Sequence, residues 1–479
     1  MTWLIVAIVL LLGAFIGIVA YRTSKFKPLE EEKRNYEEVD FDGDRAVYTL
    51  GELVKCKTVS YYNPKLEDNK EFSKLVNMLP ELYPNVMKNL KLKKFKGRAL
   101  LFHWKGKEEG NPAVFMAHYD VVPVEEENWS KPAFEALIED GIMWGRGTLD
   151  TKVTFNGVMS AGEALLQKGF TPKHDIYFAF SGGEEVSGIG ASEIVQYFVD
   201  NNITPSLVLD EGGAVVKDVF PGVKESCGLI GIAEKGIANF KFTVKSNGGH
   251  ASAPAPHTPV GVLSKACANI ENHPFRRRFT DPVLKMFDTL GRRSTLLYRI
   301  IFANLWCFGP ILDMICKKSG GELNALVRTT CAFTQMSGSM APNVVPPVAS
   351  MVANLRLIPG ETVESAVNTA KRKIHDPSVE IEVLEGYDPS RVSTTECDGY
   401  RFIKEAVEDT WRGTVVSPYL MVQCSDSRHY NDISDRVYRF SAMDLTTEER
   451  HTIHGNDEHI RLETIKSAVE FFIRVMKNC

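Results

Sequence analysis

The sequence contains 479 residues, more than a single hydrophobic core usually organises, so it predicts two or more domains. Its formal net charge of -5 gives no broad basic field, which argues against nucleic acid as a partner. The nine cysteines are scattered without any C-x-x-C pair, which predicts reduced thiols and argues against a disulfide framework or a cysteine zinc site.

The chain begins with an apolar segment. No charged residue occurs from Trp3 to Tyr21, and at about 1.5 Å per residue a helix of this length reaches roughly the 30 Å of a bilayer core. No Lys or Arg precedes it, which favours a retained single-pass membrane anchor at 1–21 over a cleaved signal peptide. By the positive-inside tendency, the basic residues that follow predict a cytoplasmic catalytic domain; they are Arg22, Lys25 and Lys27.

Residues 22–44 are charged and poor in apolar side chains, which predicts an exposed linker or helix. Beyond them, short apolar runs alternate with helical patterns, as expected for an α/β fold with a largely parallel sheet. Candidate buried strands lie in AVFMAHYDVV, DIYFAFSGGEE and PSLVLDEGG. Because ligands bind outside the carboxyl ends of such strands, six polar side chains should converge on one sheet edge: His118, Asp120, Glu184, Glu185, Asp210 and Glu211.

The adjacent acids Glu184 and Glu185 allow two interpretations. One is a charged turn after a strand. The other is a division of labour, in which one carboxylate holds a metal and its neighbour moves a proton. These residues alone do not decide between them.

Several other side chains have types that suit a metal site. His118 and Asp120 are two apart in an extended segment, so they share a face, and the carboxylate can fix the imidazole tautomer. Asp150 follows a glycine-rich turn, where a helix N-cap is the alternative. Three histidines are close together in HTIHGNDEHI, and histidine with carboxylates suits zinc without cysteine; they are His451, His454 and His459.

Eight motifs in this order resemble the aminoacylase/carboxypeptidase family of dinuclear zinc metallopeptidases: MAHYDVVPV, WGRGTLDTK, SGGEEVSG, LDEGG, GGHASAPAPHTPVG, NVVPPVASMVANLRLIPGET, SDSRHY and HGNDEHI. The similarity extends from about residue 45 to the C-terminus. The long segment before NVVPP is similar to that of carboxypeptidase S and the N-acyl-amino-acid hydrolases in particular.

The resemblance implies a site with two Zn²⁺ ions. It makes Asp150 the bridging carboxylate, with His118 and Asp210 on one ion and Glu185 and His454 on the other. It makes Asp120 the orienting acid and Glu184 the general base, which resolves the question of the paired glutamates. Glu211, His257 and His429 are then expected to be structural or rim groups.

The resemblance also implies the domain organisation. A catalytic zinc domain would occupy 45–235 and 361–479, with a ferredoxin-like α+β lid and dimerisation domain inserted at 236–360. The apolar stretch Ile300–Cys316 is short and contains Asp313, so we expect a buried or surface-apposed helical insertion instead of a second span.

Three further residues would complete the site of a homodimer. His250 and Asn343 would reach it from the lid, with the partner subunit as their expected source. Arg356 would clamp the carboxylate of the departing amino acid, and an internal salt bridge is the alternative for this charged residue in an apolar strand.

The expected activity is hydrolysis of an amide or peptide bond that releases an amino acid with a free carboxylate. The substrate would be a small N-acyl amino acid or a short peptide. A dipeptidase or aminopeptidase-like activity is one alternative, and a membrane-anchored binding module without catalysis is another. The complete set of ligand types, together with Glu184, favours an enzyme.

Overall fold

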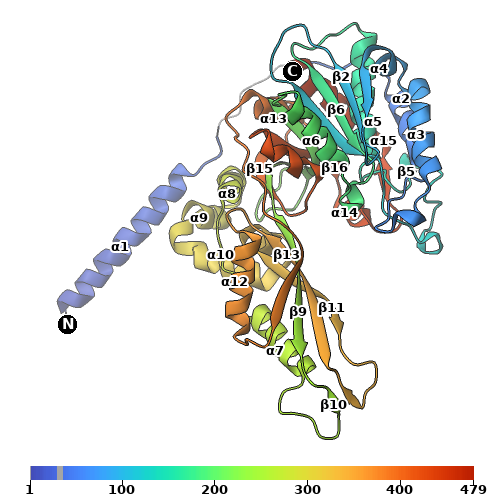
Figure 1. The fold of residues 1–479 in the computed structure, drawn as a ribbon. Helices are drawn as coiled ribbons and strands as arrows, with labels where there is room; N and C mark the ends of the chain where they lie inside the picture. Colours follow the sequence, from blue (N-terminus) through green and yellow to red (C-terminus); the bar gives the residue numbers. More distant parts are fainter. Residues whose placement is uncertain (1, 30–35) are drawn as a thin grey trace.

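The computed structural model describes residues 2–29 and 36–479, so residues 30–35 of the expected linker lie outside the described residues. The larger unit is built on an eight-stranded sheet in the order β1-β2-β6-β3-β7-β16-β8-β15 (Figure 1). Its strands are β1 (Lys91–Lys94), β2 (Leu100–Trp104), β3 (Ala113–His118), β6 (Ile176–Ser181), β7 (Leu207–Val216), β8 (Cys227–Glu234), β15 (Val415–Met421) and β16 (Val437–Leu445). The sheet is mixed, as expected, because β3 pairs in parallel with β6 and β7 while β1 and β2 are antiparallel.

Both faces of this sheet are buried because successive side chains of its central strands enter two different cores. Phe115 of β3 and Phe178 of β6 face a core with the first set of helices, whereas Val114 and Tyr177 face a core with the second. The first set comprises α2 (Gly43–Val54), α3 (Asn69–Leu82), α4 (Pro84–Asn89), α5 (Lys152–Gln167), α13 (Asp398–Thr410) and α15 (Leu462–Asn478). The second comprises α6 (Gly190–Asp200) and η4 (Asp426–Asp432).

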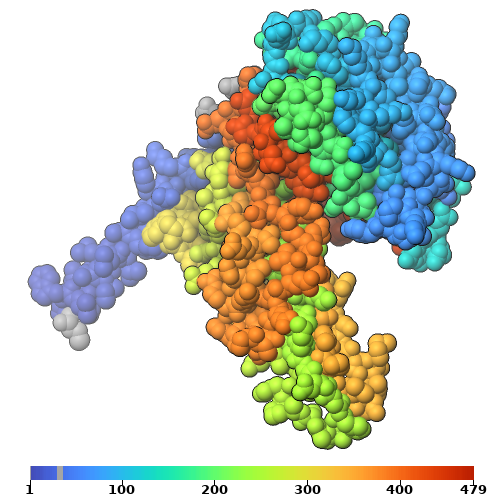
Figure 2. All heavy atoms as spheres, in the orientation of Figure 1, coloured from blue at the N-terminus to red at the C-terminus, as the bar shows by residue number. Residues whose placement is uncertain are grey.

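The smaller unit projects from the larger one (Figure 2) and is an antiparallel sheet in the order β11-β13-β9-β14. In chain order its elements are β9 (Gly236–Lys245), α7 (Pro259–Asn272), β11 (Thr330–Ser337), β13 (Val348–Leu357), α12 (Val363–Ile374) and β14 (Glu380–Tyr387). This βαββαβ connectivity is the ferredoxin-like arrangement. The alternating pattern of β9 places Phe240 and Phe242 in the small core, as its sequence suggests.

The smaller unit continues beyond the expected boundary at residue 360. Helix α12 buries Ala366, Ala370 and Ile374 in the small core, and β14 pairs with β9 through Tyr387. An amphipathic helix followed by a strand fits either unit by pattern alone, so the sequence placed this segment in the wrong one.

Four helices within 236–360 belong to the larger unit instead. They are α8 (Asp281–Arg293), α9 (Leu296–Ala303), α10 (Leu305–Ser319) and α11 (Gly321–Val327). Their apolar side chains Phe287, Phe302 and Leu312 join the large core, where Phe302 lies against Phe220 at a ring-centroid distance of 4.9 Å. The segment Ile300–Cys316 therefore forms a helical insertion, as expected, but one that packs against the larger unit.

Helix α1 (Thr2–Lys25) extends away from both units (Figure 1). Among the described residues it is the one helix that is by itself long and apolar enough to cross a membrane. Its C-terminal end contacts the insertion, because Arg22 Nε donates to Ala303 O at 3.1 Å and Asn304 Nδ2 donates to Thr23 Oγ1 at 3.2 Å.

Short elements complete the described chain. The strands β4 (Leu137–Glu139), β5 (Ile142–Trp144) and β17 (His459–Arg461) form a small sheet. The strands β10 (Gly249–His250) and β12 (Val344–Val345) pair with each other at the far end of the smaller unit (Figure 1). The short helices are α14 (Thr447–Thr452), η1 (Pro64–Leu66), η2 (Glu126–Asn128) and η3 (Glu184–Val186).

Candidate active site

The polar side chains gather where β3, β6 and β7 end or bend. β3 ends at His118, η3 with Glu184 follows β6, and β7 contains Glu211. Because β3 is parallel to both β6 and β7, these positions fall on the same edge of the sheet. The expected convergence is therefore present.

Asp150 lies between two histidines that are far apart in the sequence, His118 and His454. Its Oδ1 is 3.0 Å from His118 Nε2, and its Oδ2 is 2.9 Å from His454 Nε2. Glu185 Oε2 is 3.2 Å from the same nitrogen of His454. On the other side, Glu211 Oε1 is 3.3 Å from His118 Nε2. The site thus consists of two histidine–carboxylate sets that share Asp150.

The carboxylate beside His118 belongs to Glu211. The family resemblance had implied Asp210 at this place. Successive residues of a strand point to opposite faces, so only one of the two adjacent acids can face the histidine. Asp210 instead accepts a hydrogen bond from the backbone N–H of Ser427 at 2.9 Å and is buried. The motif LDEGG showed both acids, but its pattern did not reveal which one the strand turns towards the site.

Asp120 holds the first histidine and both glutamates. Its backbone carbonyl is 3.0 Å from His118 Nδ1, which leaves Nε2 directed at Asp150 and Glu211. Burial alone would lower the pKa of His118, but Glu211, Asp120 and Asp150 outweigh it and hold that pKa well above its ordinary value. A histidine surrounded by carboxylates in this way favours any bound positive charge, whether proton or metal.

The turn that carries Asp150 is organised by a residue that sequence reasoning missed, Glu458. Its buried carboxylate accepts the backbone N–H groups of Gly147, Leu149 and Asp150 at 3.0, 2.7 and 3.1 Å. It also pairs with Arg146 Nη1 at 2.7 Å. The only signal in the sequence is its place in HGNDEHI, four residues after His454.

These side chains fit a pair of divalent cations. His118, Asp150 and Glu185 form one group whose ligand atoms lie within 4.8 Å of one another, and His118, Glu184 and Glu211 form another. Glu185 Oε1 is buried and has no hydrogen-bond partner among the described residues, as expected for an oxygen that awaits a ligand. Nitrogen and oxygen donors without cysteine are a set that zinc accepts.

The raised pKa values of two carboxyl groups also indicate that the site favours bound positive charge. Burial, with Asp150 and Asp210 nearby, raises the pKa of Glu211 to about 8. Burial likewise raises the pKa of Glu184 well above its ordinary value, and Glu211 adds to the effect. Like charges buried this closely are costly unless cations neutralise them.

A cavity of about 400 Å³ opens from the cluster. Its lining includes Asp150, Glu184, Glu185, Glu211 and His454 of the cluster. Most of the other lining side chains are apolar, and they include Val216, Val219, Leu229, Met421, Met443, Leu445 and Ile453. A substrate bound at the cluster therefore has an apolar space beside it.

Arg356 approaches this cavity from the end of β13. Its Nη1 is 3.5 Å from Cys424 Sγ, and Cys424 lines the cavity. Its Nε donates to Asn354 Oδ1 at 3.2 Å. Among the described residues no carboxylate forms an ion pair with Arg356, so the salt-bridge alternative is not what the structure shows.

His250 and Asn343 lie together, but away from the cluster of the same chain. His250 is in β10 and Asn343 directly precedes β12, at the far end of the smaller unit, where Ala251 N donates to Asn343 O at 2.9 Å. Both are exposed, and among the described residues the His250 ring has one hydrogen-bond partner, Ser252, whose Oγ lies 2.8 Å from Nδ1. The structure of one chain therefore does not bring these two residues to the site.

Of the three candidate histidines in HTIHGNDEHI, only His454 faces the cluster. His459 Nδ1 lies 2.7 Å from Asp457 O, and its ring packs on Trp144. His451 is exposed at the end of α14. Elsewhere, His257 is exposed and His429 is half-buried in η4.

Comparison with known proteins agrees with this geometry. Residues 114–478 match the model of peptidase family M20/M25/M40. The chain is 34% identical over 437 residues to "Probable carboxypeptidase S-like 2" of Dictyostelium discoideum, which covers 90% of this chain and 84% of that protein. It is 33% identical over 439 residues to "N-fatty-acyl-amino acid synthase/hydrolase PM20D1" of Xenopus tropicalis, covering 90% and 85%.

Solved structures share the fold at low sequence identity. The M20 family metallo-carboxypeptidase Sso-CP2 from Sulfolobus solfataricus superposes with a TM-score of 0.67 at 17% identity, covering 90% of this chain and 98% of that one. Human carnosine dipeptidase 1 gives a TM-score of 0.63 at 14% identity, covering 91% and 96%. Because the family match spans most of the sequence and includes every residue of the cluster, the chain belongs to peptidase family M20/M25/M40.

Proposed function

We propose that this chain is a metal-dependent amidohydrolase that cleaves N-acyl amino acids and releases an amino acid with a free carboxylate. The proposal rests on the position of Asp150. One of its carboxylate oxygens contacts His118 and the other contacts His454. A carboxylate placed in this way can join two cations, which is the arrangement that two-metal hydrolases use.

Five residues would hold the two ions. His118 and Glu211 would bind one, His454 and Glu185 the other, and Asp150 both. When bound, two zinc ions lower the pKa of a water molecule and polarise the substrate carbonyl. Asp120 would keep His118 in the tautomer that presents Nε2 to the metal.

Glu184 is the proposed general base. It lines the cavity beside His118 and Glu211 without being the carboxylate closest to either histidine. Its raised pKa suits a group that takes a proton and later gives it to the departing amine.

The cavity favours an acyl group over a charged peptide N-terminus. Among the described lining residues outside the metal cluster, the only carboxylate is Glu322, which is bound by Arg450 Nη2 at 3.1 Å and by Tyr419 Oη at 2.5 Å. A free substrate amine would thus find no unpaired acid there, whereas the apolar wall can accept a hydrocarbon chain. The relative that is named for N-fatty-acyl amino acids supports this choice over the dipeptidase alternative.

The test combines metal analysis with an activity screen. The purified full chain should contain two zinc ions, and it should hydrolyse N-acyl amino acids with long acyl chains faster than Gly-Xaa dipeptides. Val219→Trp, which fills the apolar cavity, should lower kcat/KM for a long acyl chain far more than for an acetyl group. Val199→Trp, at an exposed position of α6, is the matched control. Faster cleavage of dipeptides would contradict the proposal.

A further inference from the structure

The insertion helices present an apolar face to solvent. In α10 the exposed apolar residues recur at helical spacing: Trp306, Pro310, Ile311, Met314 and Ile315. Leu296 and Leu297 at the start of α9 continue the pattern. We call these seven residues the α9–α10 face. Met314 is 63% exposed and Leu297 is 68% exposed, which is uncommon for grouped apolar side chains on a soluble surface.

The opposite side of the same helices is fixed to the enzyme. Phe302 of α9 packs against Phe220 and Phe287, with ring centroids 4.9 and 5.1 Å away. Leu312 and Cys316 of α10 are buried in the large core. The α9–α10 face is therefore held in place by a packed inner side.

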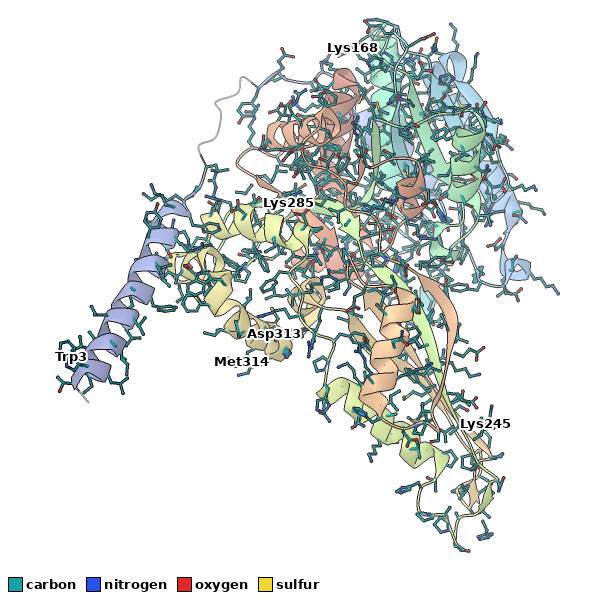
Figure 3. The ribbon with its side chains drawn as sticks, turned by 60° about the vertical axis from the view of Figure 1, so that its left-hand side comes forward. Trp3, Lys168, Lys245, Lys285, Asp313 and Met314 are labelled. Atoms are coloured by element: carbon teal, nitrogen blue, oxygen red, sulfur yellow. The ribbon has the colours of Figure 1, made fainter. Side chains whose placement is uncertain are left out.

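The one acidic residue of α10 does not interrupt this face. Asp313 is ion-paired with Arg328 and with Lys317, whose Nζ is 3.1 Å from the carboxylate. Figure 3 shows Met314 on the outer side of the insertion, on the side of the molecule where α1 and Trp3 lie. The outward surface of α10 thus stays uncharged from Trp306 to Ile315.

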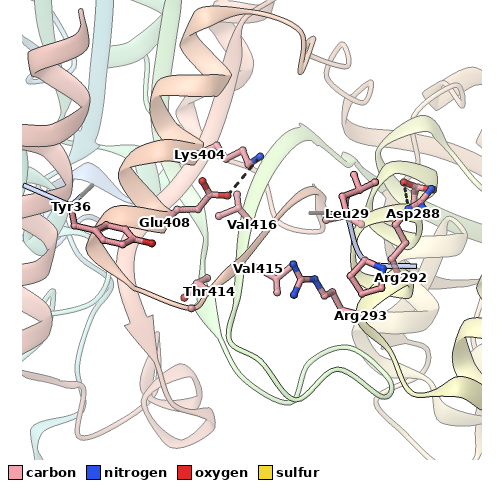
Figure 4. A pocket seen from close by; sticks show the side chains of 13 residues that line it. Leu29, Tyr36, Asp288, Arg292, Arg293, Lys404, Glu408, Thr414, Val415 and Val416 are labelled. Carbon is pink, nitrogen blue, oxygen red and sulfur yellow. Dashed lines mark hydrogen bonds and ion pairs between the residues drawn. The ribbon is translucent and has the colours of Figure 1, made fainter. Parts of the chain in front are cut away.

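The face is continuous with the apolar helix α1. Phe15, within the uncharged segment of α1, lies edge-on to Trp306 with a ring-centroid distance of 5.7 Å. Just beyond α1, Arg292 of α8 stacks over Phe26 at 4.6 Å and donates from Nη1 to Lys27 O at 3.2 Å. Figure 4 shows Leu29, in the segment that follows, beside Arg292 at a cavity of about 350 Å³. The exit of α1 is therefore docked next to the α9–α10 face.

We propose that the α9–α10 face rests in the headgroup–acyl boundary of the bilayer that α1 enters. We assign lipid as the occupant because Trp306 contacts Phe15 of α1. A bilayer that surrounds α1 at this position would therefore also contact Trp306. The insertion does not cross the bilayer, since Phe302, Leu312 and Cys316 on its inner side are buried in the large core of the enzyme unit. An amphipathic helix with Trp and aliphatic residues on one side suits this interfacial position.

The test is photo-crosslinking of the full chain in liposomes of phosphatidylcholine and phosphatidylserine. A benzophenone amino acid is placed at 311 or 314, and at Leu10 of α1 as the positive control. Leu66 is the matched negative control because it is 62% exposed and ends η1, shortly before α3, and Figure 1 shows α3 on the side of the molecule away from α1. We expect lipid adducts at positions 311, 314 and 10, and no lipid adduct at position 66.

Each other outcome overturns the inference. Adducts at position 10 without adducts at 311 and 314 would mean that α1 alone enters the bilayer. Crosslinks from 311 or 314 to a second copy of the chain would make this face a protein interface. Absence of adducts at position 10 as well would remove α1 from the bilayer, and the inference with it.

Discussion

The backbone N–H of Glu184 donates to Asp120 Oδ1 at 3.1 Å, and the next N–H, of Glu185, lies 3.3 Å from Oδ2 of the same carboxylate. One buried acid thus fixes the backbone of both glutamates, while their side chains serve different parts of the site. Glu185 reaches His454, and Glu184 lies with His118 and Glu211.

Substitutions of the two glutamates should therefore have different effects on turnover and on metal content. Glu184→Gln should lower kcat by about 10²–10⁴-fold or more, because it removes a proton acceptor, and should leave metal content near that of the wild type. Glu185→Ala should lose metal, because it removes a ligand. Metal analysis beside steady-state kinetics checks both, and equal metal loss in the two variants would refute the division of roles.

Glu211 and Asp210 provide a second pair of neighbours with different roles. Glu211→Gln should reduce the metal content from two ions per chain to one, because its carboxylate faces His118. Asp210→Asn should keep both ions and lower the free energy of unfolding by about 1–3 kcal/mol, since a buried acceptor of the Ser427 N–H is weakened. The reverse pattern in metal analysis would restore Asp210 as the ligand.

Arg356 should recognise the carboxylate of the leaving amino acid. Arg356→Lys loses the planar fork, so KM for an N-acyl amino acid should rise about 10–100-fold. The amidated analogue, which has no carboxylate, should be affected far less. Equal losses for both substrates would assign Arg356 a structural role.

The position of His250 leads us to expect that it acts on a partner subunit. His250→Ala should be nearly inactive and fully metallated, with a loss of about 10²–10³-fold in kcat for one missing hydrogen-bond donor. Mixing it with inactive Glu184→Gln should restore activity, because a mixed dimer contains one site with both residues intact.

His257→Ala is the control for the His250 experiment, since His257 is exposed in the segment that follows and should keep its activity. If subunits demonstrably exchange and no activity returns, His250 does not act in trans.

His429 should make stability depend on pH in acid. Burial, with Arg428 nearby, lowers the pKa of His429 to about 4, whereas in the unfolded chain it stays near 6.5. Between these values the unfolded chain binds the proton and the folded chain does not, so stability falls as pH decreases from 6.5 to 4. The loss is on the order of 3 kcal/mol. Urea unfolding of His429→Gln should show a shallower decline than the wild type, and identical profiles would contradict this.

Much of the cluster could be predicted because strand ends and motif order are properties of the sequence. His118, Asp120, Asp150, Glu184, Glu185 and His454 were expected together and do lie together. The prediction chose Asp210 instead of Glu211 because the choice depends on which face of β7 each side chain occupies. That orientation is set by the pairing of β7 with its neighbours, and two adjacent acids in a sequence do not reveal it.

The domain boundaries were less predictable for a related reason. Helix α12 and the insertion helices have apolar faces that fit any core of suitable shape, so pattern alone cannot assign Ala366 to the small core or Phe302 to the large one. Tertiary packing decides that choice. Glu458 escaped notice because three of its four partners are backbone N–H groups, which no side-chain motif displays; the fourth is Arg146.

Glu458 also constrains the order in which the protein can assemble. During synthesis the turn with Asp150 emerges some three hundred residues before the carboxylate that fixes it, a sequence separation of 308. His454, which faces Asp150, arrives in the same late segment. Until that segment has been made, the part of the site around Asp150 lacks both the Glu458 carboxylate, which fixes its turn, and the second histidine, His454. The nascent chain would therefore be unable to form the proposed pair of metal sites until a late step of folding.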